Sequence, residues 1–123
     1  MCCYFALELT TLNHINTVEN DLIVAKKLLQ LKQSADSRNI EFDLSFVTIK
    51  KLLNAKRCYY TGEPFEENGD NSRSIDRVDP NRGYVEGNVV ACTVNINQKK
   101  ANLTCEEIHQ ISRKLKEHQR NKR

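Results

Sequence analysis

The sequence predicts a single α+β domain. Two segments near the N-terminus repeat apolar residues at helical spacing, and the second half contains a strand–turn–strand–helix pattern. The length of 123 residues fits one domain, and 39% hydrophobic with 28% charged residues is ordinary for a globular protein. Three parts are expected along the chain: an N-terminal helical part (1–57), a central part (58–104) and a basic C-terminal helix (105–123).

The N-terminal part is expected to form two helices. Residues 17–38 place leucine, isoleucine and alanine along one side of a helix that begins at Thr17 or Asn20. Residues 45–55 repeat phenylalanine, isoleucine and leucine at the same spacing, which predicts a second and shorter helix.

The central part alternates turn signals with short strands. A first strand is expected at 73–78, and a D-P-N-R-G turn follows it. A second strand is expected over 84–92, with a looser middle at its Gly-Asn pair. Residues 93–101 contain no helix breaker and are expected to be helical. A T-x-x-E capping box at 104–107 then opens the last helix.

Several short motifs follow one another within the central part. They are C-Y-Y-T-G (58–62), S-I-D-R-V-D (74–79), G-Y (83–84), N-V-V (88–90) and N-x-x-K (97–100). In this order and spacing they resemble the motifs of HNH endonucleases, particularly the small ones common in phages. The resemblance covers residues 42–104, about half of the chain, and it implies a ββα-metal core between the N-terminal helices and the C-terminal helix.

The resemblance implies a site for one divalent cation. Asp76 near the end of the first strand and Asn97 on the following helix would be its protein ligands. A carboxylate and an amide oxygen are hard ligands, which suit Mg²⁺ or Mn²⁺. Asn88 matches the family residue that usually braces the loop between the strands. Simpler explanations stay open, because Asp76 could pair with a neighbouring arginine and Asn97 could be a solvated helix residue.

Position 77 is the main departure from the family. Catalytic HNH proteins often carry there a histidine that accepts a proton from the attacking water, whereas this chain has Arg77. Arginine stays protonated and has no acceptor, so it cannot act as a general base. It could instead hold a phosphate or stabilise developing charge. The three histidines, at 14, 109 and 118, lie outside the motifs.

No structural zinc is expected. Some relatives brace the motif with two CxxC pairs that form a Cys₄ site. Here Cys58 is followed by Thr61 at the partner position, and Thr93 with Ile96 stand where the second pair would be. Hydrophobic packing is expected to replace the metal.

Positive charge gathers at the C-terminal end. The formal net charge is only +3, but from Lys99 onward eight basic residues stand against three acidic ones. This distribution suits a polyanionic partner, and a solvated helix with a basic tail explains it equally well. Contacts to nucleic acid are expected from Arg77, Lys99, Lys100, Arg113, Lys114 and Lys116.

The compartment expected by default is the cytoplasm, of the host cell if a phage encodes the chain. No window is long and apolar enough for a membrane span, and the first twelve residues include Glu8 and lack a basic start, unlike a secretory signal. Five cysteines without CxxC spacing are then expected as free thiols, with Cys2 and Cys3 acting as small hydrophobic residues.

The sequence therefore supports three hypotheses of function. The first is an HNH-type, metal-dependent endonuclease that nicks or cuts DNA, with Asp76, Arg77, Asn88 and Asn97 as its catalytic set. The second is a catalytically degenerate HNH-fold binding protein, a phage-type regulator or inhibitor acting on nucleic acid or on a host protein. A third reading makes the chain part of a larger complex, docked through its apolar N-terminal segment.

Overall fold

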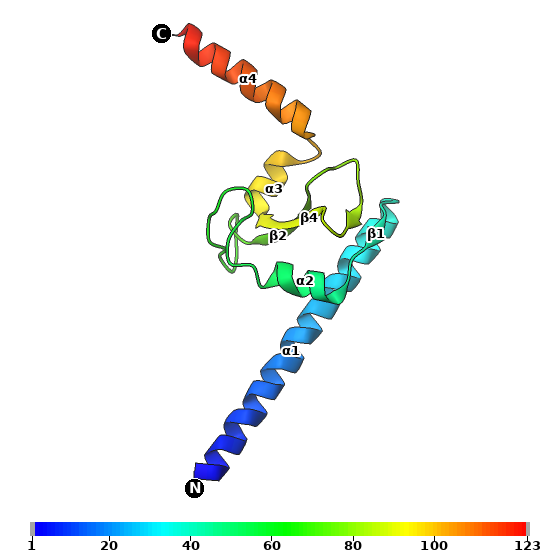
Figure 1. The fold of residues 1–123 in the computed structure, drawn as a ribbon, viewed down its shortest axis with the longest axis vertical. Coiled ribbons are helices and arrows are strands. Elements are labelled where there is room, and N and C mark those ends of the chain that lie inside the picture. Colours follow the sequence, from blue (N-terminus) through cyan, green and yellow to red (C-terminus); the bar gives the residue numbers. More distant parts are fainter. Residues whose placement is uncertain (1, 123) are drawn as a thin grey trace.

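The computed structural model is α+β, as the sequence predicts (Figure 1). It describes the backbone of residues 2–122 and the side chains of residues 17–122. In chain order the elements are α1 (Cys2–Ser37), β1 (Phe42–Asp43), α2 (Phe46–Leu53), β2 (Arg73–Arg77), β3 (Tyr84–Val85), β4 (Val89–Thr93), α3 (Val94–Lys100) and α4 (Cys105–Asn121). The side chains of Cys2, Cys3 and His14 lie outside the described residues.

Helix α1 is one continuous helix of 36 residues. The predicted start at Thr17 or Asn20 is wrong: the helix begins at Cys2 and runs through both positions, with no glycine or proline upstream to end it. The predicted end is right. Asn39 takes a left-handed φ of 54°, and the Ile40 N–H donates to the Ala35 carbonyl at 2.8 Å, as in a Schellman motif.

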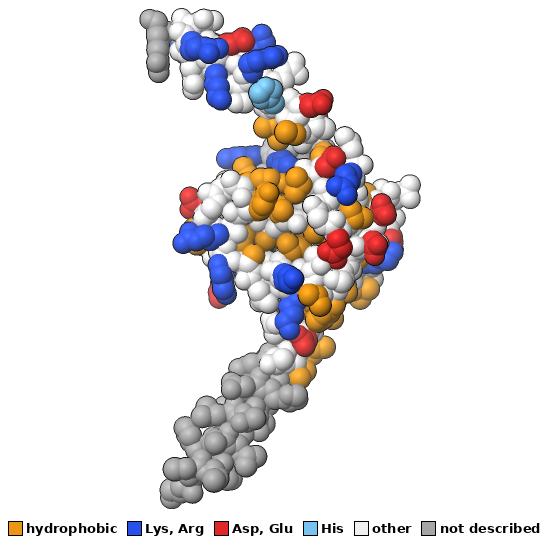
Figure 2. All heavy atoms as spheres, viewed as in Figure 1, with side chains coloured by type: hydrophobic (Ala, Val, Ile, Leu, Met, Phe, Trp, Pro, Cys, Tyr) orange, Lys and Arg blue, Asp and Glu red, His pale blue; other side chains and the backbone are white. Residues whose placement is uncertain are grey.

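The hydrophobic core lies where α1, α2 and the strands meet. The second predicted helix is confirmed as α2, whose first turn is capped by the Ser45 side chain accepting from the Thr48 N–H. Figure 2 shows hydrophobic side chains gathered on this central body. The buried apolar cluster consists of Val24, Ala35, Leu44, Ile49, Ile75 and Tyr84.

The predicted strand 84–92 is two strands in two different sheets, so this expectation needs correction. β3 pairs in parallel with β1, whereas β4 pairs antiparallel with β2. Between β3 and β4, Gly87 has a φ of +84°, which an extended strand cannot contain. The segment therefore links the N-terminal helical part, through β1, to the β2–β4 ribbon.

Two helices follow β4 directly. α3 begins at Val94 and is capped by Thr93, whose hydroxyl accepts from the Ile96 N–H, and it packs on β2 and β4. The capping box predicted for α4 is confirmed, with reciprocal bonds between Thr104 and Glu107. α4 then extends away from the body, opposite to the N-terminal end of α1 (Figure 1). Within the described part of the chain, no helix is both long and apolar enough to cross a membrane.

Candidate functional site

The candidate site lies on the face of β2 that α3 covers. Side chains two residues apart on a strand point to the same side, so Ser74 and Asp76 both face α3. On the helix, Asn97 Nδ2 donates to Ser74 Oγ at 2.7 Å, and Lys100 Nζ lies 3.1 Å from Asp76 Oδ2. Asp76 on β2 and Asn97 on α3, the two predicted metal ligands, thus lie where the strand and the helix meet, each bonded to a residue of the other element.

Asp76 is a buried carboxylate with two donors on one oxygen. The residue is 7% exposed, and its Oδ2 accepts from the Tyr60 hydroxyl at 2.7 Å as well as pairing with Lys100. The Lys100 ammonium also donates to the Arg77 carbonyl at 3.0 Å. An ammonium group has three donors, so one of them stays available for a further acceptor.

Both predicted metal ligands keep one oxygen free. Asp76 is held through Oδ2 and Asn97 through Nδ2, so Oδ1 of each accepts no hydrogen bond from any described residue. A carboxylate and an amide oxygen suit Mg²⁺ or Mn²⁺, which take their other ligands from water and phosphate. The nearby Lys100 ammonium opposes a cation by repulsion, but it contacts the other carboxylate oxygen. These residues fit a hydrated divalent ion with two protein ligands.

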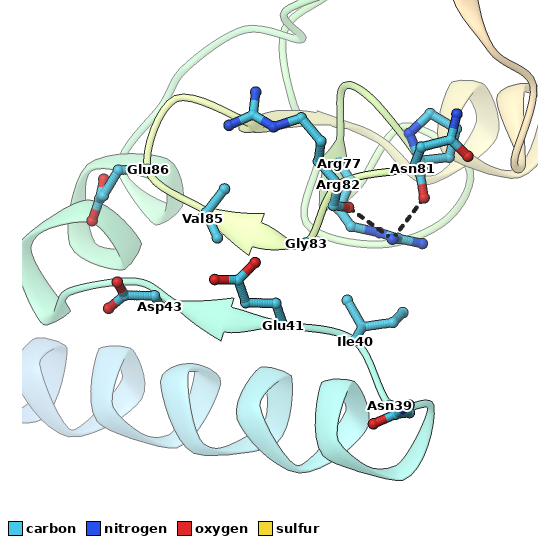
Figure 3. A pocket seen from close by; sticks show the side chains of 11 residues that line it. Asn39, Ile40, Glu41, Asp43, Arg77, Asn81, Arg82, Gly83, Val85 and Glu86 are labelled. Carbon is cyan, nitrogen blue, oxygen red and sulfur yellow. Dashed lines mark hydrogen bonds between the residues drawn. The ribbon is translucent and has the colours of Figure 1, made fainter.

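Arg77 points to the opposite face of β2. Its Nη1 donates to the Pro80 and Arg82 carbonyls, both at 3.0 Å (Figure 3). Its guanidinium lies over the Tyr84 ring, 5.5 Å from the ring centre. Arg77 thus closes the turn that follows β2. The structure does not bring its guanidinium to the face that carries Asp76 and Lys100.

A groove of about 750 Å³ lies beside this turn (Figure 3). Its lining includes the guanidinium groups of Arg77 and Arg82 and the carboxylates of Glu41, Asp43 and Glu86. Three acidic groups beside two basic ones give no surplus of positive charge, so the groove does not favour a phosphate.

Asn88 braces the same turn from inside the protein. It is 2% exposed, its Oδ1 accepts from the Asp79 N–H at 2.9 Å, and its Nδ2 donates to the Asp79 and Gly83 carbonyls. These bonds satisfy backbone groups between β2 and β3. Asn88 therefore acts on the shape of the turn and does not reach the Asp76 carboxylate through any of its hydrogen bonds.

The remaining predicted contacts to nucleic acid are spread over two helices. Lys99 is exposed on α3, one residue before Lys100. Arg113, Lys114 and Lys116 are exposed on α4, where Figure 2 shows Lys and Arg side chains gathered. Lys114 also pairs with Glu117 at 3.3 Å on the helix surface. The structure thus separates a compact group at Asp76 from a basic helix beyond it.

Sequence reasoning missed the contact between Tyr60 and Asp76. The C-Y-Y-T-G motif does not assign a partner to Tyr60, whereas the structure places its hydroxyl on the carboxylate 16 residues later. Burial, with the hydrogen bond to Asp76 as a second cause, raises the pKa of Tyr60 well above its ordinary value of 10.0. Tyr60 therefore remains a protonated donor at neutral pH. The sequence offers only a tyrosine in the motif that precedes the one with Asp76. That pattern does not specify a hydrogen bond between the two side chains.

Cys58 and Cys92 are buried free thiols, and Cys105 is an exposed one. Burial, together with nearby Asp76, raises the pKa of Cys92 to about 12. For Cys58 burial acts in the same direction, but hydrogen bonds involving Thr61 and the Thr93 backbone outweigh it and lower the pKa. Among the described residues, no three His, Cys, Asp or Glu side chains gather in a group that could hold a metal.

The chain is similar to two viral proteins of undefined activity. It is 36% identical over 86 residues to an uncharacterized 29.0 kDa protein from the dda-modA intergenic region of Enterobacteria phage T4, covering 69% of this chain and 35% of that protein. It is 31% identical over 88 residues to uncharacterized protein R423 of Acanthamoeba polyphaga mimivirus, covering 71% of this chain and 16% of that protein. The chain thus spans about a third and a sixth of these relatives. No family model matches it, and no solved structure matches it significantly.

Proposed function

We propose that this chain is an HNH-type, metal-dependent endonuclease that cleaves phosphodiester bonds of DNA, with β2, β4 and α3 as its ββα-metal core. One observation carries the proposal: Asp76 is held through Oδ2 and Asn97 through Nδ2, so Oδ1 of each side chain accepts no hydrogen bond from a described residue. Ligands fixed in this way by neighbouring hydrogen bonds are typical of metal sites.

The surrounding residues have defined roles in this proposal. Lys100 neutralises Asp76 and keeps a donor for a phosphate oxygen, while Lys99 is exposed beside it for the next phosphate. Asn88 and Arg77 hold the turn after β2 in shape. When bound, Mg²⁺ or Mn²⁺ would supply Lewis acidity towards the scissile phosphate and the attacking water.

A second candidate function is DNA binding without hydrolysis. It is favoured by Arg77, which stands at the position of the usual base and whose Nη1 donates to two backbone carbonyls on the other face of β2. His109 and His118, the histidines with described side chains, are exposed on α4 and do not contact Asp76. A regulator or inhibitor could use the same scaffold to bind nucleic acid or a host protein.

A plasmid assay tests the first proposal against the second. Supercoiled DNA is incubated with wild type, Asp76→Asn, Asn97→Ala and the control Asp70→Asn in Mg²⁺ or Mn²⁺, across a range of pH. Asp70 is an exposed loop carboxylate, so its variant makes the same charge change away from the site. We expect wild type and Asp70→Asn to nick or cut the plasmid, and the two site variants to be slower by roughly 100-fold or more.

The nuclease proposal fails if wild type leaves the plasmid intact in both metals, or if Asp76→Asn cuts as fast as wild type. A salt-dependent shift of the intact plasmid by wild type would then support the second candidate. Intact plasmid without any binding would exclude both DNA functions, and binding to a protein partner would be the remaining hypothesis.

A further inference from the structure

Tyr60 occupies a turn that is fastened to the ribbon beneath it. The Tyr59 N–H donates to the Ala91 carbonyl on β4 at 2.9 Å, and the Gly62 N–H donates to the Cys58 carbonyl at 2.9 Å. Gly62 has a φ of 75°, which lets the chain reverse there. This turn fixes the Tyr60 backbone beside β4, and the Tyr60 hydroxyl donates to Asp76 on β2.

The Tyr60 hydroxyl and the Lys100 ammonium both act on Asp76 Oδ2. Their distances to this oxygen are 2.7 and 3.1 Å, and the ammonium lies 5.9 Å from the centre of the Tyr60 ring. Because both donors bind Oδ2, the two oxygens of the Asp76 carboxylate are no longer equivalent. Oδ1 is the oxygen that remains available to a ligand.

We infer that Tyr60 is a positioning residue for the divalent ion, which fixes the Asp76 carboxylate so that Oδ1 alone is presented as the ligand. The inference rests on the proposed function. Lys100 could hold the same oxygen, but its charge repels the ion and its stem is long and flexible. The Tyr60 hydroxyl is a neutral donor on a rigid ring, so it can keep its bond while a cation occupies the other side of the carboxylate.

The test is direct Mn²⁺ binding, measured from the electron paramagnetic resonance signal of free Mn²⁺. Tyr60→Phe removes only the hydroxyl and keeps the ring beside Lys100 and Tyr59. The matched control is Tyr59→Phe, which changes the adjacent tyrosine, whose side chain is 67% exposed and makes no hydrogen bond to Asp76. We expect the Kd for Mn²⁺ to rise about tenfold or more in Tyr60→Phe and to stay at the wild-type value in Tyr59→Phe.

Further measurements and variants separate the outcomes. Circular dichroism and Tm establish that both variants are folded before the titration, and Asp76→Asn defines the loss of the site. If Tyr60→Phe binds Mn²⁺ as wild type does while Asp76→Asn does not, the inference about Tyr60 is wrong and the proposed metal site stands. If wild type itself binds no Mn²⁺, the proposed metal site fails and the inference fails with it. Tyr60→Trp, which restores a ring donor of different reach, should not recover wild-type affinity if the position of the hydroxyl is what matters.

Discussion

At the scale of single residues, Asn88 is the side chain on which the turn after β2 depends. Replacing it with alanine removes three hydrogen bonds and leaves the Asp79 N–H and the Gly83 carbonyl without their partners in the protein interior. We expect Asn88→Ala to lower the free energy of unfolding by about 2–4 kcal/mol. Urea denaturation measures this, with Asn81→Ala as the control because its exposed side chain lies in the same turn. Equal urea midpoints for Asn88→Ala and Asn81→Ala would contradict the role of Asn88 in stabilising this turn.

The sequence could predict that Asp76 on β2 and Asn97 on α3 lie on the same side of the strand. Strand alternation and the position of the next helix determine this arrangement. The side on which Arg77 lies follows from the same alternation. The hydrogen bond from Tyr60 could not be predicted, since it depends on how the 58–62 turn packs against β4. Likewise, the motif places Lys100 one turn after Asn97, but its burial against Asp76 is a tertiary feature.

At the scale of elements, the segment from 84 to 92 shows where a local pattern is insufficient. Its composition favours a strand, and alternation alone does not reveal that Tyr84 pairs with Phe42 whereas Val90 pairs with Asp76. Partner choice depends on β1, which is only two residues long and has no strong signal of its own. Tyr84 is further held by Arg38, which donates to its hydroxyl at 2.9 Å from the C-terminal end of α1.

Gly83 permits the contact between β3 and β1. A Cβ atom at this position would lie 2.4 Å from the Glu41 carbonyl oxygen, the acceptor for the Tyr84 N–H. Gly83→Ala should therefore separate the two strands and lower the free energy of unfolding by about 1–3 kcal/mol. Hydrogen exchange should show lost protection at the Tyr84 amide. Gly87→Ala is the comparison, because it strains the backbone at a positive φ without any contact within 4 Å. A Tyr84 amide that exchanges as slowly in Gly83→Ala as in wild type would refute this account.

At the scale of the whole molecule, the chain combines a packed centre with two helices that extend from it in opposite directions (Figure 1). The centre carries the Asp76 site, whereas α4 carries four basic residues, which follow its acidic first turn. On α4, Arg113, Lys116 and Arg120 recur at intervals of three and four residues and form one row. Ile108, Ile111 and Leu115 recur in the same way on the other side. If the chain binds DNA as proposed, we expect this basic row to contact the phosphate backbone beyond the Asp76 site.

The basic row leads to a prediction about affinity and salt. Arg113→Gln combined with Lys116→Gln should weaken binding to duplex DNA and should lower the slope of log K against log salt by about 0.9 per lost contact. Fluorescence anisotropy of a labelled duplex at several salt concentrations measures both quantities. Lys26→Gln combined with Lys51→Gln removes the same charge from exposed positions on α1 and α2. If both pairs reduce affinity and slope equally, binding follows net charge alone and α4 is not the DNA-contacting helix. A loss confined to the α4 pair would place the DNA along α4, leading from there towards Lys99 and the Asp76 site.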